Sequence, residues 1–223
     1  MRERQGSSES SRKYSTTVQK RSLLTVYRLF FALLGLGAIV TEVATLAERG
    51  RLNPGNLFSF FTIQGNVIGA AVLLLSTLAV THEIPSRTLA KLRGAATLYI
   101  VIVGIVFSVL LAGIEGAEFT AVPWDNYVLH YIMPVAVAVD WFLDLPAERI
   151  AFRQASLWLV YPVAYVLYSE IRGLLVNWYP YPFLDPGKNG YGAVAVTSIG
   201  IAAFAAALTW FLTRFTRVTS SAG

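Results

Sequence analysis

Six long apolar runs, separated by short polar segments, are the feature of this sequence that most constrains its fold. They cover approximately residues 23–47, 57–80, 94–113, 127–143, 156–176 and 191–212. An apolar run of about 20 residues matches a hydrocarbon core of roughly 30 Å. The short connections make neighbouring helices antiparallel. The sequence therefore predicts an all-α fold, a polytopic membrane protein built as one six-helix transmembrane bundle.

The two ends of the chain differ from this apolar middle. Residues 1–22 are polar, basic and rich in serine, which predicts a disordered cytoplasmic tail. Residues 23–212 form the predicted transmembrane domain, and residues 213–223 a short cytoplasmic C-terminal tail. The first run is longer than the core of a signal peptide, which spans about 7–15 residues, so we expect a retained helix.

The composition excludes several classes of site. The chain is 55% hydrophobic and 14% charged, whereas soluble domains carry about 25% charged residues. It has no cysteine, which rules out disulfides and thiolate metal sites. Its only histidines are His82 and His130, which argues against a multi-histidine metal centre. We therefore expect neither a metal nor another cofactor.

The basic residues predict the orientation. One side of the predicted bundle carries only Arg49, Arg51 and Lys188. The other side carries Arg2, Arg4, Arg12, Lys13, Lys20, Arg21, Arg87, Lys91, Arg93, Arg149, Arg153, Arg214 and Arg217. The positive-inside rule then places both termini in the cytoplasm of a plasma-membrane protein. The net charge of +5 indicates affinity for anionic lipid and no nucleic-acid partner.

Two polar residues at the same predicted depth suggest chemistry. The runs 57–80 and 127–143 both pass from outside to inside, with Thr62 and His130 a few residues from their outer ends. At about 1.5 Å per residue, both side chains lie roughly 5–8 Å below the outer end. A threonine hydroxyl becomes a nucleophile when a base takes its proton, and histidine suits that role near neutral pH. We predict a catalytic pair.

Other polar residues are candidates for supporting roles. Asn66 follows Thr62 by one helical turn, and Asn126 precedes His130 by one turn. Candidates to orient the histidine are Asn126, Glu42 and Asp125. Candidate donors to a tetrahedral oxyanion are Gln64, Asn66, Tyr168 and Arg172. Gln64 lies about 200° around the helix from Thr62, so it could instead serve a neighbouring helix.

Two further features have structural interpretations. Residues 177–192 hold three prolines, three glycines and several aromatic residues, which predicts a non-helical cap on the outer side. Asp140 lies about 15 Å deeper than His130, where it could cap a helix or pair with Arg149.

Three short blocks carry a resemblance to a known family. They are Phe-Thr-Ile-Gln-Gly-Asn at 61–66, Leu-His-Tyr-Ile-Met-Pro at 129–134 and Tyr-Pro-Phe-Leu-Asp at 181–185. In this order and spacing the chain resembles the androgen-induced and androgen-dependent TFPI-regulating proteins. It is more similar to their bacterial six-helix relatives of unassigned function. The likeness in helix count and order covers roughly residues 23–212.

The resemblance implies a function. The animal members are multipass threonine hydrolases that cleave fatty acid esters of hydroxy fatty acids. It implies that Thr62 is the nucleophile and His130 its base, and the third block adds Asp185 to the candidate substrate-binding residues. The block around Thr62 differs from the animal pattern, so the substrate does not carry over. The expected partners are membrane lipid and a small lipid-like ester.

Other interpretations compete with catalysis. A lone threonine in a membrane helix more often bonds the carbonyl four residues earlier or packs against a neighbour. The tyrosines and Arg172 could anchor the helix at the interface. The chain could thus be a non-catalytic binder or transporter of a lipid or small solute. It could also be a structural protein, in which case Thr62 could lie more than about 7 Å from His130.

Overall fold

A computed structural model describes residues 2–79, 86–114 and 120–216, with side chains from residue 19 onward, and every regular element in these ranges is helical. The principal helices are α1 (Arg2–Glu48), α3 (Phe61–Leu78), α4 (Ser86–Val106), α6 (Met133–Leu143), α8 (Val160–Val176) and α9 (Pro186–Arg214). The short helices are α2 (Pro54–Leu57), α5 (Pro123–Tyr127) and α7 (Phe152–Ala155). The described ranges also contain two π turns, η1 (Phe107–Leu111) and η2 (Val128–Ile132), and two 3-10 turns, η3 (Ser156–Leu159) and η4 (Pro182–Leu184). The predicted all-α class is confirmed for these residues.

Six helical segments of the described chain are long and apolar enough to cross a membrane. They are Gln19–Glu48, Phe61–Leu78, Ser86–Leu111, Pro123–Leu143, Phe152–Val176 and Pro186–Arg214. Each contains one of the six predicted apolar runs or most of it. The third begins eight residues earlier than predicted, because Arg87 and Lys91 continue the helix at its polar end.

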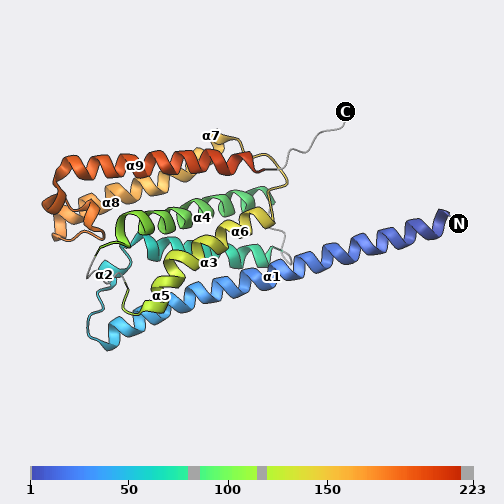
Figure 1. Cartoon of the computed structure of the whole chain (residues 1–223), viewed down its shortest axis with the longest axis horizontal. Coiled ribbons are helices and arrows are strands. Elements are labelled where there is room, and N and C mark those ends of the chain that lie inside the picture. The colour runs from blue at the N-terminus through green and yellow to red at the C-terminus, as the bar shows by residue number, and fades with distance from the viewer. Residues whose placement is uncertain (1, 80–85, 115–119, 217–223) are drawn as a thin grey trace.

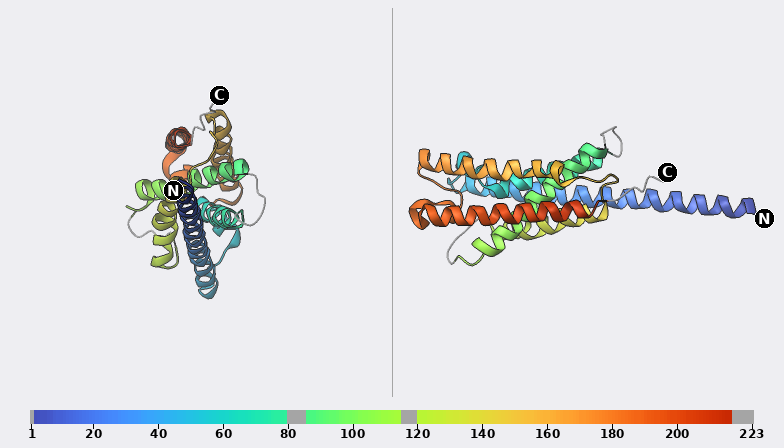
Figure 2. Two further views of the ribbon diagram at one scale, coloured as in Figure 1. Left: turned by 90° about the vertical axis from the view of Figure 1, so that its right-hand side faces the viewer. Right: turned by 90° about the horizontal axis from the view of Figure 1, so that it is seen from above.

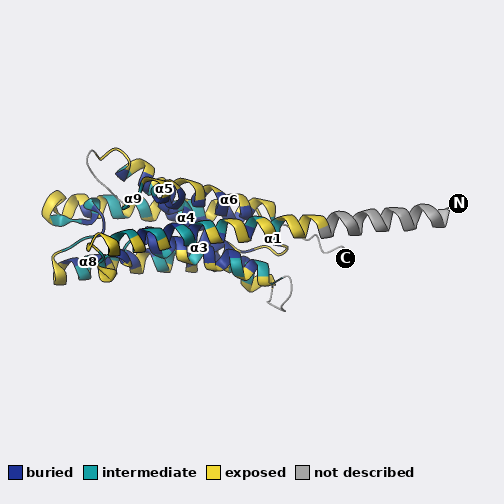
Figure 3. Ribbon diagram, turned by 90° about the horizontal axis from the view of Figure 1, so that it is seen from below, coloured by how far each residue is buried: buried dark blue, intermediate teal, exposed yellow. Residues whose placement is uncertain are grey.

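The segments form one elongated bundle with α4 near its middle (Figures 1 and 2). Helix α4 packs against α3, α6 and α9, while α1 packs against α3, α5 and α6. Helices α8 and α9 cover the opposite side from α1 (Figure 1). The buried residues lie along the middle of the bundle, and the outward faces are largely exposed (Figure 3). These exposed faces are apolar, as expected of surfaces that meet lipid.

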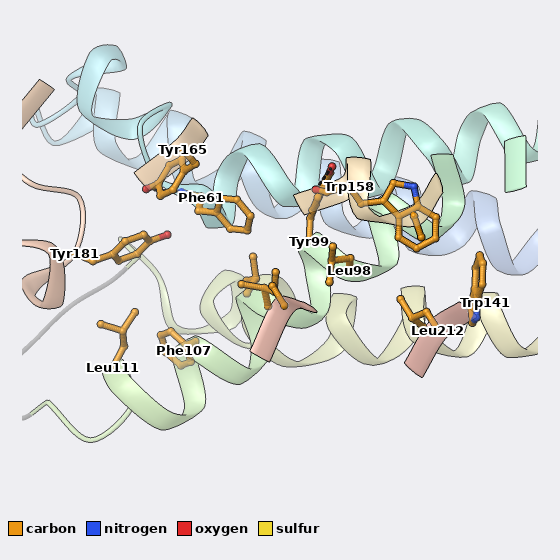
Figure 4. Close-up of a cluster of buried hydrophobic side chains, with 14 of the residues drawn as sticks. Phe61, Leu98, Tyr99, Phe107, Leu111, Trp141, Trp158, Tyr165, Tyr181 and Leu212 are labelled. Carbon is orange, nitrogen blue, oxygen red and sulfur yellow. Dashed lines mark hydrogen bonds between the residues drawn. The ribbon is translucent and has the colours of Figure 1, made fainter. Parts of the chain in front are cut away.

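Close packing between α4 and η3, the turn that precedes α8, depends on a glycine. A Cβ atom at Gly94 would lie 2.2 Å from the Trp158 ring, so only glycine allows this approach. The indole of Trp158 also meets Trp141 edge to face, with ring centroids 6.5 Å apart. Trp141, Trp158 and Leu212 belong to the large apolar cluster that joins α4, α6, α8 and α9 (Figure 4).

A buried ionic network joins α1, α4 and α6. Arg28 Nε donates to Asp140 Oδ1 at 2.6 Å, and Arg93 Nη2 donates to Asp140 Oδ2 at 2.8 Å. Both arginines also reach the carboxylate of Asp144, at 2.6 Å and 3.2 Å. Of the two roles predicted for Asp140, the pairing with Arg149 is therefore wrong. Arg93, which lies just before the predicted apolar run 94–113, is buried within α4, where these carboxylates compensate its charge.

Two segments differ from their sequence-based descriptions. Helix α1 extends back to Arg2, through residues for which a disordered tail is predicted; that stretch has no proline and one glycine to interrupt a helix. The predicted non-helical cap ends at Asp185, and α9 begins at Pro186, earlier than expected. Its first turn is separated from the rest by Gly190, whose φ of 74° lies in the left-handed region.

Candidate functional site

The structure brings Thr62 and His130 into direct contact. Thr62 Oγ1 lies 3.2 Å from His130 Nε2, and both side chains are buried, at 7% and 3% exposure. Thr62 is the second residue of α3, and His130 lies in the π turn η2 that precedes α6. The two side chains thus lie at the same level of the bundle, and the distance between the two atoms is that of a hydrogen bond.

A main-chain carbonyl sets the tautomer of the histidine. His130 Nδ1 lies 3.1 Å from the carbonyl oxygen of Asn126. A carbonyl oxygen can only accept, so Nδ1 carries the proton and Nε2 of the neutral ring presents a lone pair. That lone pair accepts from the Thr62 hydroxyl. Asn126, one of the predicted orienting residues, thus acts through its backbone, and its side-chain Oδ1 is buried without a partner.

An aromatic ring fixes the plane of the imidazole. Phe107 stacks on His130 with ring centroids 3.8 Å apart and an interplanar angle of 21°. Phe107 begins the π turn η1, and His130 lies in the π turn η2. A π turn inserts one residue into a helix and re-aims the side chains beside it. The two stacked rings therefore come from two such turns, which sequence periodicity did not indicate.

Tyr181 completes the polar cluster and was absent from the predicted site. Its hydroxyl oxygen accepts from the Thr62 backbone N–H at 3.1 Å and lies 3.2 Å from Thr62 Oγ1. Burial raises the pKa of the Tyr181 hydroxyl above its ordinary value, so the group keeps its proton at neutral pH. Since the Thr62 proton points at His130, Tyr181 donates to Thr62 Oγ1. Its place in the third sequence block was the available signal.

The N-terminus of α3 has no conventional cap. Phe60, in an extended conformation, precedes the helix, and its side chain makes no capping bond. Hydroxyls from elsewhere in the chain replace the cap: Tyr165 accepts from Phe61 N at 3.2 Å, and Tyr181 accepts from Thr62 N. The positive end of the helix dipole is thus held beside the Thr62 hydroxyl. Figure 4 shows both tyrosines directed toward the start of α3 from separate segments.

Asn66 acts as a support for the backbone. Its side-chain amide donates to Thr62 O at 2.9 Å and to Leu129 O at 3.2 Å, which ties α3 to η2. Both amide protons are used, so Asn66 is not positioned to donate to an oxyanion as predicted.

Two of the predicted oxyanion donors form hydrogen bonds with groups other than Thr62. Gln64 donates to Phe58 O at 2.7 Å and accepts from Tyr161 of α8, so it serves the neighbouring helix. The hydroxyl of Tyr168 lies 2.7 Å from Ser59 Oγ.

The remaining two candidates also have other partners. Arg172 donates to Asn56 Oδ1 at 2.8 Å and lies over the Trp178 ring. Asp185 is the N-cap of α9, where its carboxylate accepts from Gly187 N at 2.9 Å.

A cavity of about 290 Å³ opens onto the pair, and we name it the polar cavity. Its wall includes Thr62, His130 and Tyr181, and it reaches the surface beside the exposed side chains of Arg51 and Asn53. Glu42, a predicted site residue, also lines it and accepts from Ala121 N at 2.6 Å. Its remaining lining residues are Leu46, Asn56, Leu57, Phe60, Ile63, Leu111, Thr120, Ala121, Leu129 and Trp178.

The arrangement of Tyr181, Thr62 and His130 is suited to nucleophilic attack by the Thr62 hydroxyl. The hydrogen-bond chain runs from Tyr181 to Thr62, from Thr62 to His130, and from His130 to the Asn126 carbonyl. A hydroxyl that donates to the lone pair of a neutral imidazole is the arrangement of an activated nucleophile. Among the residues that the structure describes, no group of three or more histidine or acidic residues could hold a metal ion.

Comparisons of the chain with models of known protein families, with curated proteins and with solved structures find no match.

Proposed function

We propose that this protein is an integral membrane hydrolase of lipid-like esters, with Thr62 as nucleophile and His130 as general base. The observation that carries this proposal is the buried contact of 3.2 Å between Thr62 Oγ1 and His130 Nε2 at the wall of a cavity. The Asn126 carbonyl supports it, because it leaves Nε2 free to accept the proton. The resemblance of three sequence blocks to the threonine hydrolase family points to the same pair.

The proposed reaction has two steps. His130 Nε2 takes the Thr62 proton as Oγ1 attacks the ester carbonyl, and an acyl-threonine forms when the alcohol leaves with that proton. Water then gives a proton to Nε2 and bonds to the acyl carbon. The bond from that carbon to Oγ1 breaks, Nε2 returns the proton to Thr62 Oγ1, and the carboxylic acid leaves. Tyr181 takes the role for which Asn66 is one of four sequence-based candidates, because its protonated hydroxyl can turn from Thr62 Oγ1 to the developing oxyanion.

The proposal also includes the orientation of the protein in the plasma membrane. Both termini lie in the cytoplasm and Thr62 lies near the outer face of the plasma membrane. The support is the distribution of lysine and arginine, which are scarce beside Thr62 and abundant at the opposite end.

Hydrolysis by purified protein in detergent micelles tests the function. Thr62→Ala is expected to reduce turnover of a p-nitrophenyl ester by about a thousandfold or more, and His130→Ala by a similar factor. The matched control is Thr77→Ala on the same helix, because the Thr77 hydroxyl donates to the carbonyl of Leu73 and does not line the polar cavity. Folding of each variant is checked by thermal unfolding.

The same assay distinguishes the non-catalytic alternative, which the polar cavity also supports. A non-catalytic binder would bind a lipid-like ester without cleaving it. Thr62→Ala would then change the affinity for the ester, and neither protein would show turnover. Turnover that is equal in wild type and Thr62→Ala would remove Thr62 from the mechanism.

A further inference from the structure

An apolar pocket lies on the other side of Thr62 from the polar cavity. It has a volume of about 50 Å³ and lies between α3, α4 and α8. Thr62, Leu111 and Tyr181 line both spaces, so they form the boundary between them. Figure 4 shows Tyr181 on one side of this boundary region, with Phe107 and Leu111 opposite.

The apolar pocket continues toward the outer surface of the bundle. A groove of about 260 Å³ lies between α8 and α9 and shares Pro162, Val166 and Ile201 with the pocket. We call it the α8–α9 groove. All but one of its lining residues are apolar, and Leu167 and Ile199 on its walls are exposed. The pocket beside Thr62 and the α8–α9 groove at the lipid-facing surface are thus neighbouring apolar spaces with a shared wall.

His130 is placed asymmetrically with respect to these spaces. It lines the polar cavity, and it lines neither the apolar pocket nor the groove. The group that protonates the leaving alcohol must reach the alcohol oxygen, so that oxygen must lie on the side of His130. The acyl chain then has to extend from Thr62 in the other direction. Burial of its methylene groups between apolar walls is favourable.

We propose that the ester lies across Thr62 with its acyl chain in the apolar pocket and the α8–α9 groove and its alcohol in the polar cavity. This rests on the proposed function. The alcohol leaves toward Arg51 after the bond between acyl carbon and alcohol oxygen breaks and Nε2 gives that oxygen its proton. Water enters by the same cavity and reaches His130, while the acyl group stays held on Thr62. The substrate class is an ester of a linear acyl chain with a polar or bulkier alcohol.

Two substitutions test this arrangement at two distances from Thr62. Val166→Trp fills the junction of pocket and groove, and Ala202→Trp fills the groove further out. Val166→Trp is expected to lower turnover of octanoyl and lauroyl esters by about tenfold or more and to spare acetyl esters. Ala202→Trp is expected to affect only the lauroyl ester. The control is Ala203→Trp, which is exposed beside Ala202 and lines no described pocket.

A second measurement works without turnover. The Thr62→Ala protein is incubated with a lauroyl ester that carries a photoreactive diazirine at the end of the acyl chain, and the cross-linked peptides are identified by mass spectrometry. Cross-links in α8 and α9 that Ala202→Trp removes support the arrangement, even if wild type proves unable to hydrolyse any ester. In that case only the proposed function fails.

Opposite outcomes overturn the arrangement. The first is cross-linking of the acyl chain to residues around Leu46 and Arg51 in the polar cavity. The second is a loss of turnover in Val166→Trp that becomes larger with the size of the alcohol and does not depend on acyl length. A Val166→Trp protein that does not fold leaves the decision to Ala202→Trp and the cross-links.

Discussion

Neutral His130 can accept the Thr62 proton only because the Asn126 carbonyl occupies Nδ1. The pairing of Thr62 with His130 could be predicted from sequence, since rise per residue and helix direction place two residues at one depth. The group that orients His130 could not be predicted. It is a main-chain carbonyl, which every residue has, so the type of side chain gives no signal. Tyr181 escaped prediction because it lies in a non-helical segment whose path has no period.

Tyr181→Phe tests the residue that sequence reasoning missed. The substitution removes the hydroxyl near Thr62 Oγ1 and keeps the buried ring. If this hydroxyl stabilises the oxyanion, kcat for ester hydrolysis is expected to fall by about tenfold to a hundredfold while KM changes little. Tyr179→Phe, in the same segment, is the control. An unchanged kcat in Tyr181→Phe would show that the hydroxyl only caps α3.

At the scale of elements, apolar runs predicted the six helical segments, because burial in lipid requires long apolar helices. The π turns η1 and η2 were not predicted, since one inserted residue leaves no mark on the hydropathy pattern. The partners of Asp140 were also missed. Arg28 and Arg93 lie 112 and 47 residues away along the chain, and spacing cannot pair residues on separate helices.

The ionic network predicts that removal of the Arg93 charge strongly destabilises the protein. Arg93→Ala removes one of the two arginines that compensate the buried carboxylate of Asp140, and we expect a loss of about 3–5 kcal/mol in the free energy of unfolding. Arg87→Ala is the matched control on α4, because its pair with Glu148 is exposed and worth at most about 1 kcal/mol. Thermal unfolding in micelles measures both. Equal losses would contradict the buried network.

The close packing of α4 against Trp158 predicts that replacement of Gly94 by alanine destabilises the protein. Gly94→Ala places a Cβ against the indole and is expected to destabilise the protein by about 1–3 kcal/mol. Gly200→Ala, in α9, meets nothing within 4 Å and is expected to be neutral or stabilising by up to about 1 kcal/mol. Unfolding of the two variants under one set of conditions makes the comparison. A stable Gly94→Ala would show that α4 and Trp158 are not in close contact.

At the scale of the whole molecule, the bundle places the Thr62 site at one end and the ionic network near the other. The sequence predicts both termini on the network side, and the orientation follows from charge alone. Because the chain has no cysteine, single cysteines report it directly. Lys188→Cys is expected to react with a membrane-impermeant maleimide in intact cells, and Arg87→Cys only after permeabilisation. The reverse pattern would invert the proposed topology.

The central claim is that Thr62 forms the bond to the substrate, and the position of a covalent adduct tests it most directly. Purified wild-type protein is treated with a fluorophosphonate probe, and the modified peptide is sequenced by mass spectrometry. We expect the adduct on Thr62, with none formed in His130→Ala, because the hydroxyl would then lack its base. An adduct on any other residue, or labelling that persists in Thr62→Ala, would contradict the account.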